Sequence, residues 1–142
     1  MILKPKIINY MKKAKLLLAI IGLSMLTFHC IAQNSITNNP IKIGELLVAR
    51  SDFRMQMKWA DSRKACEKLK NGWRLPNRAE LNLLYENKNK IPGLNGKYYW
   101  SIEQSIENHA WLQFFNDGTQ DDYLKFTMCW VRPVKSIEDL SK

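Results

Sequence analysis

The chain has 142 residues, three cysteines and a formal net charge of +9. Five of its 22 Lys and Arg residues lie in the first 15 positions, so the rest of the chain carries 17 basic against 13 acidic residues, a net charge of +4. A charge this small predicts solubility and argues against nucleic-acid binding. The part after the leader, about 110 residues, has the length of one domain.

The beginning of the chain has the pattern of a secretory signal peptide. A lysine-rich start, for which Met11 is as good an initiator as Met1, precedes the uncharged apolar run Leu16–Phe28. This run is shorter than the ~20 residues that span a bilayer, and a small-x-small exit follows it. We therefore expect cleavage after Ala32, export to the periplasm, the cell surface or the medium, and no transmembrane segment in the mature chain.

Cys30 allows an alternative, in which this residue is lipidated and anchors the protein to a membrane. Lipid-bearing cysteines usually follow small residues, whereas Phe28 and His29 precede this one, so cleavage after residue 32 is favoured. The polar residues after the leader, which include Pro40, indicate a loose lead-in. The expected organisation is a signal peptide over 1–32, a flexible lead-in over 33–41, a domain over 42–136 and a tail over 137–142.

The first half of the mature chain predicts a strand and then a helix. The run Ile41–Ala49 is of β type, interrupted by Gly44, and residues 50–56 indicate a turn with a second short strand. From Trp59 onward, apolar and small side chains recur at spacings of three and four, which places them on one face of a helix. The pair Asn71-Gly72 provides a stop for this helix.

The stretch NGWRLPNRAEL predicts a corner that leads into a second helix. Pro76 keeps Leu75 extended, because the residue before proline avoids the helical region. Asn77 is a good N-cap, and Glu80 three residues later completes a capping box. Arg74 can clamp groups inside the fold or bind a ligand, and the structural role is favoured because the apolar residues around it crowd it.

The rest of the chain predicts β-structure. A short strand is expected over Tyr98–Ser101, and residues 109–115 alternate in a strand that ends at the hairpin signal Asn116–Gly118. The final strand is expected over Thr127–Val134, with Pro133 at its end or at a sheet edge. The order of elements predicts an α+β domain with antiparallel strands.

The segment from Met57 to Tyr85, followed by YYWS, AWLQFFNDGTQ and VRPV, resembles a known family. It is the bacterial extracytoplasmic family named for the C-terminal domain of the Legionella collagen-like adhesin, related to the Fibrobacter paralogous-domain proteins. The resemblance implies a C-type-lectin-like fold, in which two helices pack on short antiparallel strands and which the formylglycine-generating enzyme shares. The signature residues of this chain are Trp59, Trp73, Arg74, Leu75, Pro76, Glu80, Trp100 and Arg132.

Cys66 and Cys129 remain after cleavage of the leader. An even pair in an exported chain predicts a disulfide, and two buried free thiols are the alternative. The bridge would close a loop of about 64 residues, which stabilises a fold by about 4 kcal/mol in the chain-entropy model. The family resemblance also implies a bridge between the first helix and the last strand, where these two residues are expected.

The residues offer little for catalysis or metal binding. His109 is the single histidine after the leader, and nothing in the spacing provides the nucleophile and orienting acid that a catalytic histidine needs. A zinc site needs three or four His or Cys ligands. The oxygen ligands in Asn116–Gly118 and Asp121–Asp122 fit calcium, but a hairpin turn explains them better. We expect no enzyme activity, no metal and no cofactor; formylglycine chemistry would need a second C-terminal cysteine.

The segment Asn116–Phe126 lies between the strands expected over 109–115 and 127–134. It offers polar side chains beside aromatic rings, which suits a sugar or a peptide. We therefore expect an exported recognition domain for a glycan or a cell-surface protein. The alternative is a structural or accessory module, lipid-anchored through Cys30 or not, in which this segment is only a solvated connection. The hypothesis rests on fold analogy. The candidate ligand residues are Trp111, Asn116, Asp117, Gln120, Asp121, Asp122, Tyr123 and Lys125.

Overall fold

The computed structural model describes residues 36–94 and 96–140. The predicted signal peptide and the alternative lipidation site Cys30 lie outside these residues. The described chain has the expected α+β architecture, with two three-stranded antiparallel sheets, ordered β1-β2-β6 and β3-β4-β5. The elements are β1 (Ile41–Ile43), β2 (Leu46–Val48), α2 (Trp59–Lys68), α3 (Arg78–Glu86), η1 (Lys88–Lys90), β3 (Tyr98–Gln104), β4 (His109–Phe114), β5 (Gln120–Leu124), β6 (Val134–Ser136) and η2 (Ile137–Leu140).

Three strand predictions were wrong in their details. The run Ile41–Ala49 is the β1–β2 hairpin, since Gly44 has a φ of 59° and turns the chain. Residues 50–56 form no strand. The expected last strand is also displaced, because its first half makes only isolated bridges, such as Met57 with Cys129. Strand β6 begins after Pro133, which lacks the N–H that a ladder needs.

Helix α2 packs against strands β3 and β4. Its first residue, Trp59, donates its backbone N–H to the carbonyl of Lys125 (3.0 Å) and its indole N–H to the carbonyl of Ser101 (2.8 Å). Its apolar face joins a buried cluster with the sheet. This cluster contains Trp59, Cys66, Leu75, Trp100, Ala110, Leu112, Cys129 and Val131.

The corner before α3 forms as predicted. The Asn77 side chain accepts the N–H of Glu80, and the Glu80 carboxylate accepts the N–H of Asn77, a complete capping box. Arg74 clamps the same carboxylate with two bonds of 2.7 and 2.8 Å. Burial by itself would raise the pKa of Glu80, but the hydrogen bonds from Arg74 and Asn77 outweigh it and lower the pKa. Arg74 thus makes the clamp on a carboxylate inside the fold that the structural interpretation expects.

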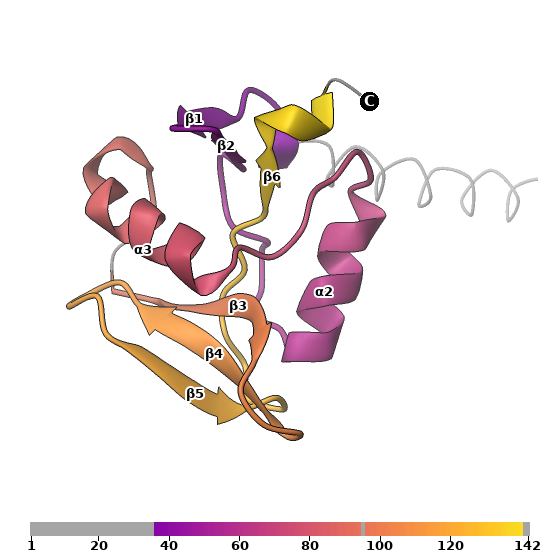
Figure 1. Cartoon of the computed structure of the whole chain (residues 1–142), viewed down its shortest axis with the longest axis vertical. Coiled ribbons are helices and arrows are strands. Elements are labelled where there is room, and N and C mark those ends of the chain that lie inside the picture. Colours follow the sequence, from indigo (N-terminus) through magenta and orange to yellow (C-terminus); the bar gives the residue numbers. More distant parts are fainter. Residues whose placement is uncertain (1–35, 95, 141–142) are drawn as a thin grey trace, which may run out of the picture. The chain divides into compact units, whose positions relative to one another are not determined.

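A second buried cluster joins α3 to both sheets. Its members are Ile43, Leu46, Val48, Leu81, Leu84, Ile91, Leu94, Tyr99, Phe115 and Val134. Figure 1 shows β1, β2 and β6 at one end of the domain, the β3–β4–β5 sheet at the other, and the two helices between them. Neighbouring residues of β3, Tyr99 and Trp100, belong to different clusters. The helices therefore pack on opposite faces of this sheet, since neighbouring side chains of a strand point to opposite faces.

Candidate functional site

The predicted ligand segment is divided between two faces of the β3–β4–β5 sheet. Asp122 pairs with Trp111, and Gln120 pairs with Gln113, whereas Asp121 pairs with Leu112 and Tyr123 with Ala110. Directly paired residues share a face, and successive residues of a strand alternate. Trp111, Gln120 and Asp122 therefore lie on one face, and Asp121 and Tyr123 lie on the other.

The first face is occupied by contacts with α3 and the β3–β4 turn. The guanidinium of Arg78 stacks on the Trp111 ring at 3.6 Å. The Gln120 side chain accepts from Arg78 Nε (3.0 Å) and donates to the Arg78 carbonyl (2.8 Å). The Asp122 carboxylate accepts from the Ser105 hydroxyl. These three candidate residues thus hold the helix and the turn on the sheet.

Arg78 is a residue that sequence reasoning missed. It is the first residue of α3 and falls at a variable position between the Leu-Pro and Glu-Leu pairs of the corner. Its backbone N–H donates to the Glu103 carboxylate (2.9 Å). No local signal identifies its partners, because α3 meets β4 and β5 only through tertiary packing.

The hairpin turn between β4 and β5 accounts for two more candidates. Asp117 Oδ1 accepts the Thr119 N–H (2.9 Å) and the Thr119 hydroxyl (2.8 Å). These bonds hold the pKa of the exposed Asp117 below its ordinary value. Asn116 is exposed at the same turn. The turn interpretation of this stretch is confirmed, since Gly118 has a φ of 84°.

The second face carries an exposed aromatic cluster, formed by Tyr98, Phe114 and Tyr123. The rings of Tyr98 and Phe114 stack with centroids 4.3 Å apart and planes inclined by 15°. The Tyr98 and Tyr123 ring centroids are 6.4 Å apart. Tyr98 is 44% and Tyr123 41% exposed, and Asp121 is exposed on the same face. Of these residues, only Asp121 and Tyr123 were predicted as ligand residues.

Lys125 lies at the end of β5, beside the start of α2. Its Nζ donates to Gln104 Oε1 (2.8 Å) and to the carbonyl of Glu107. An open pocket of about 560 Å³ lies next to it. The pocket is lined by Lys58, Ala60, Asp61, Asn108, Leu124, Lys125 and Phe126. Lys125 is thus the one candidate residue that lines this hollow, and its ammonium is already hydrogen-bonded.

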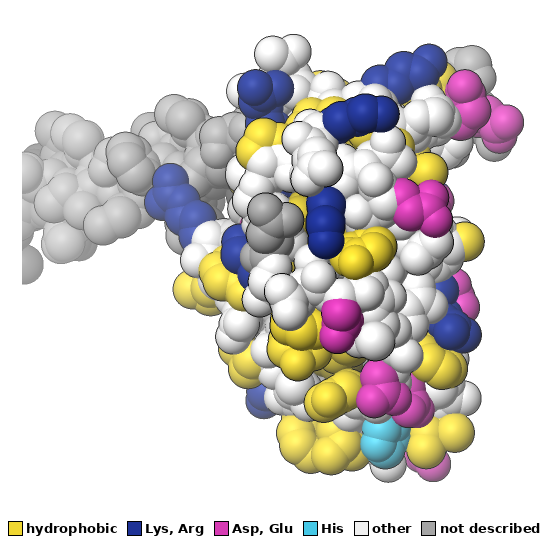
Figure 2. All heavy atoms as spheres, turned by 90° about the vertical axis from the view of Figure 1, so that its left-hand side faces the viewer, with side chains coloured by type: hydrophobic (Ala, Val, Ile, Leu, Met, Phe, Trp, Pro, Cys, Tyr) yellow, Lys and Arg dark blue, Asp and Glu magenta, His cyan; other side chains and the backbone are white. Residues whose placement is uncertain are grey.

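Charge is distributed unevenly over the domain. The segment Tyr98–Leu124, which forms the β3–β4–β5 sheet, contains five carboxylates and no Lys or Arg. Figure 2 shows Lys and Arg mainly in the upper half of one face, with hydrophobic and acidic side chains close together in the lower half. Figure 1 places the β3–β4–β5 sheet at that same lower level. The sheet is therefore an acidic region of a basic protein.

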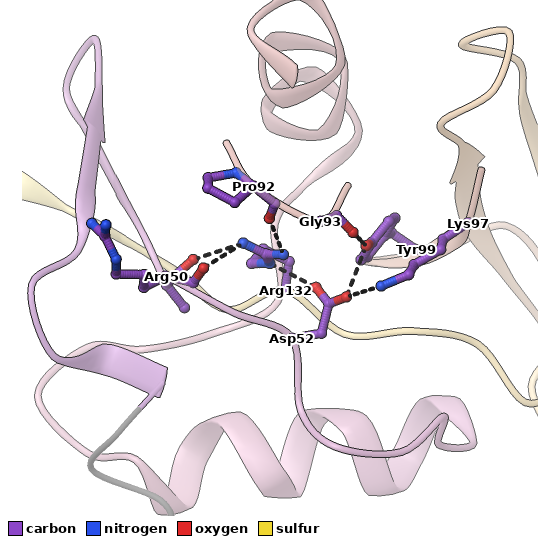
Figure 3. Close-up of polar contacts among 8 residues, drawn as sticks. Arg50, Asp52, Pro92, Gly93, Lys97, Tyr99 and Arg132 are labelled. Atoms are coloured by element: carbon purple, nitrogen blue, oxygen red, sulfur yellow. Dashed lines mark hydrogen bonds and ion pairs between the residues drawn. The ribbon is translucent and has the colours of Figure 1, made fainter. Parts of the chain in front are cut away.

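A buried ionic centre lies around Asp52 (Figure 3). Arg132 Nε donates to Asp52 Oδ1 (2.6 Å), and Lys97 Nζ (2.8 Å) and the Tyr99 hydroxyl (2.9 Å) donate to Oδ2. Burial next to Asp52 raises the pKa of Tyr99. The guanidinium of Arg132 also donates to the carbonyl oxygens of Ala49, Arg50 and Pro92. Because the donors and acceptors bind one another, this centre joins three loops rather than holding a reactive group.

The bridge predicted between Cys66 and Cys129 is not formed in this structure, which has both residues as free, buried thiols. Both belong to the apolar cluster between α2 and the sheet, so both contribute to its packing without a bond. Burial raises the pKa of each thiol to about 12. A free thiol with such a pKa is protonated at neutral pH and is a poor nucleophile.

Within the described residues, no three His, Cys, Asp or Glu side chains gather in a way that could hold a metal ion. His109 begins β4, and its Nδ1 is buried without a hydrogen-bond partner. In a Ser-His-Asp triad that nitrogen donates to an orienting carboxylate, and His109 Nδ1 has no such partner among the described residues. Over the same part of the chain, no helix has both the length and the apolar character needed to cross a membrane.

Comparisons with known proteins agree with the architecture. The family model described as the Lcl C-terminal domain matches residues 33–135. The crystal structure of botrocetin, a C-type-lectin-like protein, aligns with a TM-score of 0.55 and 10% sequence identity, over 70% of this chain and 97% of botrocetin. No curated protein matches the sequence. At this identity the likeness to botrocetin shows the fold alone.

Proposed function

Because the chain belongs to the Lcl C-terminal domain family and has a C-type-lectin-like fold, we propose that it is an exported, non-catalytic recognition domain. Family and fold fit a small binding domain. We propose that its ligand, a glycan or a cell-surface protein, contacts the aromatic cluster of Tyr98, Phe114 and Tyr123. The single observation that carries this assignment is the exposure of two tyrosine rings on the sheet face that also carries Asp121. The Tyr98 ring stacks on Phe114, and the Tyr123 ring is tilted against Tyr98.

The aromatic cluster has the character of a binding surface because its rings are held in place yet remain accessible. Tyr98 is fixed by stacking on Phe114, so little conformational freedom is lost when a ligand covers it. The aromatic rings of Tyr99 and Trp100, next in sequence, are fully buried in the core. Tyrosine is enriched at binding surfaces because it combines an apolar ring with a hydroxyl.

The other candidates support the fold in this proposal. Trp111 and Gln120 bind Arg78, and Asp117 closes the turn. A catalytic role would need a reactive group, whereas the thiols of Cys66 and Cys129 are buried and protonated. A recognition domain, in contrast, needs a surface that a ligand can cover and no reactive group.

Export is part of the proposal and has its own test. The family fits an extracellular protein. Mass spectrometry of the protein recovered after export is expected to find Gln33 at the amino terminus, and a lipidated Cys30 would contradict this. The Cys66–Cys129 disulfide also stays a prediction for the exported protein. A measured mass that is two hydrogens below the mass of the reduced chain would identify it.

Binding is tested by a glycan array and by adhesion of the purified protein to cell surfaces. We expect the array or the cells to identify a ligand, and we expect the Tyr98→Ala variant and the Tyr123→Ala variant each to lose binding to it. Ile106→Ala is the matched control, because Ile106 is a 62% exposed apolar side chain outside the cluster. Equal loss in the control would mean that general apolar surface drives binding. If the protein binds neither a glycan on the array nor a cell surface, it is an accessory module and the proposal is wrong.

A further inference from the structure

We infer that the aromatic cluster, together with Asp121, binds Lys or Arg side chains of a basic, extended segment of a partner protein. This inference rests on the proposed function, since it assigns a ligand class to the same surface. Neither the family nor the likeness to botrocetin carries it. It follows from the spacing of two tyrosine rings, from one carboxylate with a free oxygen, and from the charge of the sheet.

The ring geometry suits a cation. A cation interacts favourably with an aromatic ring when it lies within ~6 Å of the ring centroid. The centroids of Tyr98 and Tyr123 are 6.4 Å apart, and their planes are inclined by 48°. An ammonium or guanidinium placed above the gap between them is therefore within reach of both rings. Phe114 fixes the Tyr98 ring from one side by stacking.

Asp121 supplies the charge on the same face. It lies two residues before Tyr123 on β5, so the two side chains project to the same side of the sheet. Its Oδ1 accepts the backbone N–H of Asp122 (2.8 Å), and this carboxylate makes no other hydrogen bond within the described residues. Oδ2 can therefore accept from a cationic donor, and such charge-assisted bonds are the stronger ones.

The surroundings favour cations over anions. The sheet contains five carboxylates and no Lys or Arg between Tyr98 and Leu124. Cations that flank the sheet in sequence are engaged elsewhere, because Lys97 binds Asp52, and Lys125 binds Gln104 and the Glu107 carbonyl. Arg78 stacks on Trp111 on the opposite face. A field of this sign attracts a basic partner and repels a polyanion.

The edge of the sheet favours an extended polypeptide over a small cation. Within the described residues, β5 pairs with β4 alone and forms the edge of its sheet. An extended segment can add to such an edge through main-chain hydrogen bonds, while its alternate side chains reach one face. On that face it would meet Tyr123 and Asp121. A neutral sugar could stack on the rings, but it would gain nothing from the charge.

The test is fluorescence anisotropy of labelled peptides with the purified protein. One peptide alternates Lys with Thr over ~10 residues, long enough to span an edge strand, and its partner has the same sequence with every lysine acetylated. We expect the lysine peptide to bind, the acetylated peptide to bind at least about tenfold more weakly, and added salt to weaken binding. Tyr98→Ala, Tyr123→Ala and Asp121→Asn are each expected to weaken binding of the lysine peptide.

Asp117→Asn is the matched control for charge. It removes one carboxylate from the same acidic segment but lies in the hairpin turn, outside the cluster. We expect less than about a twofold change, because the Asp117 carboxylate is exposed and already accepts two hydrogen bonds from Thr119, and an exposed charge is screened by salt. Circular dichroism and the melting temperature of each variant establish that it is folded. Equal effects of Asp117→Asn and Asp121→Asn, or equal binding of the two peptides, would overturn the inference.

The outcomes also separate this inference from the proposed function. A neutral or anionic glycan that binds through Tyr98 and Tyr123, with no binding of the lysine peptide, would overturn the cation assignment and leave the recognition function standing. If the lysine peptide, the array and the cells all fail to bind, both are wrong.

Discussion

Replacement of Asp52 by Asn tests how much the buried ionic centre contributes to stability. The Arg132 side chain is 1% exposed, and it keeps its charge in the variant because a guanidinium does not lose its proton. Removing one partner of a buried ion pair costs about 3–5 kcal/mol. Domains of this size unfold with about 5–15 kcal/mol, so we expect Asp52→Asn to lose a large part of the total stability.

Urea unfolding followed by tryptophan fluorescence measures this loss as a fall in the transition midpoint. In a thermal unfolding experiment on the same variant, a loss of about 3 kcal/mol corresponds to a fall in the melting temperature of about 12 °C or more. The matched variant is Lys97→Met, since Lys97 binds the same carboxylate but is 30% exposed, and exposed ion pairs contribute about 1 kcal/mol or less. If Asp52→Asn costs no more than Lys97→Met, the reasoning from burial is wrong.

Three other predictions follow from the described contacts. Gly118→Ala should destabilise the protein by more than about 1 kcal/mol, because the added Cβ would lie 2.5 Å from the Tyr85 ring. Gly44→Ala, in the β1–β2 turn, should lower the melting temperature less, because its added Cβ would meet nothing within 4 Å. Glu80→Gln should remove part of the stability measured at neutral pH and progressively less as the pH falls below 4.5. Folding lowers the pKa of Glu80 from 4.5, so its contribution is present above that value and is lost as the pH falls through the folded-state pKa. Cys66 and Cys129, if reduced, should resist thiol reagents at pH 8 until the protein is unfolded, because burial raises both pKa values to about 12; rapid labelling of the folded protein would contradict this.

The parts of the fold that sequence could predict are those governed by neighbouring residues. The corner before α3 follows from Pro76, Asn77 and Glu80, which lie within five positions, and the structure has this capping box. The β4–β5 turn follows in the same way from Gly118. The β1–β2 hairpin was missed, because Gly44 was interpreted as an interruption of one strand and not as a turn between two.

Contacts between distant residues could not be predicted in this way. Asp52 and Arg132 are separated by 80 positions, and their pairing depends on how three loops meet. Arg132 was recognised as a signature residue without a partner. The same limit applies to Arg78, whose stacking on Trp111 depends on the packing of α3 against the sheet. Sequence patterns identify which residues are important more readily than they identify what those residues touch.

The alternation of β5 explains why the predicted ligand segment is divided between two faces of the sheet. A list of polar and aromatic residues treats Asp121 and Asp122 as equivalent, but neighbouring side chains of a strand point to opposite faces. Asp122 faces the side on which Ser105 and α3 pack, and Asp121 faces the aromatic cluster. The strand can therefore stabilise the fold with one face and present a surface with the other. Substitutions of Tyr98 or Tyr123 should change binding with little loss of stability, whereas Trp111→Ala should lose stability, since Trp111 stacks on Arg78.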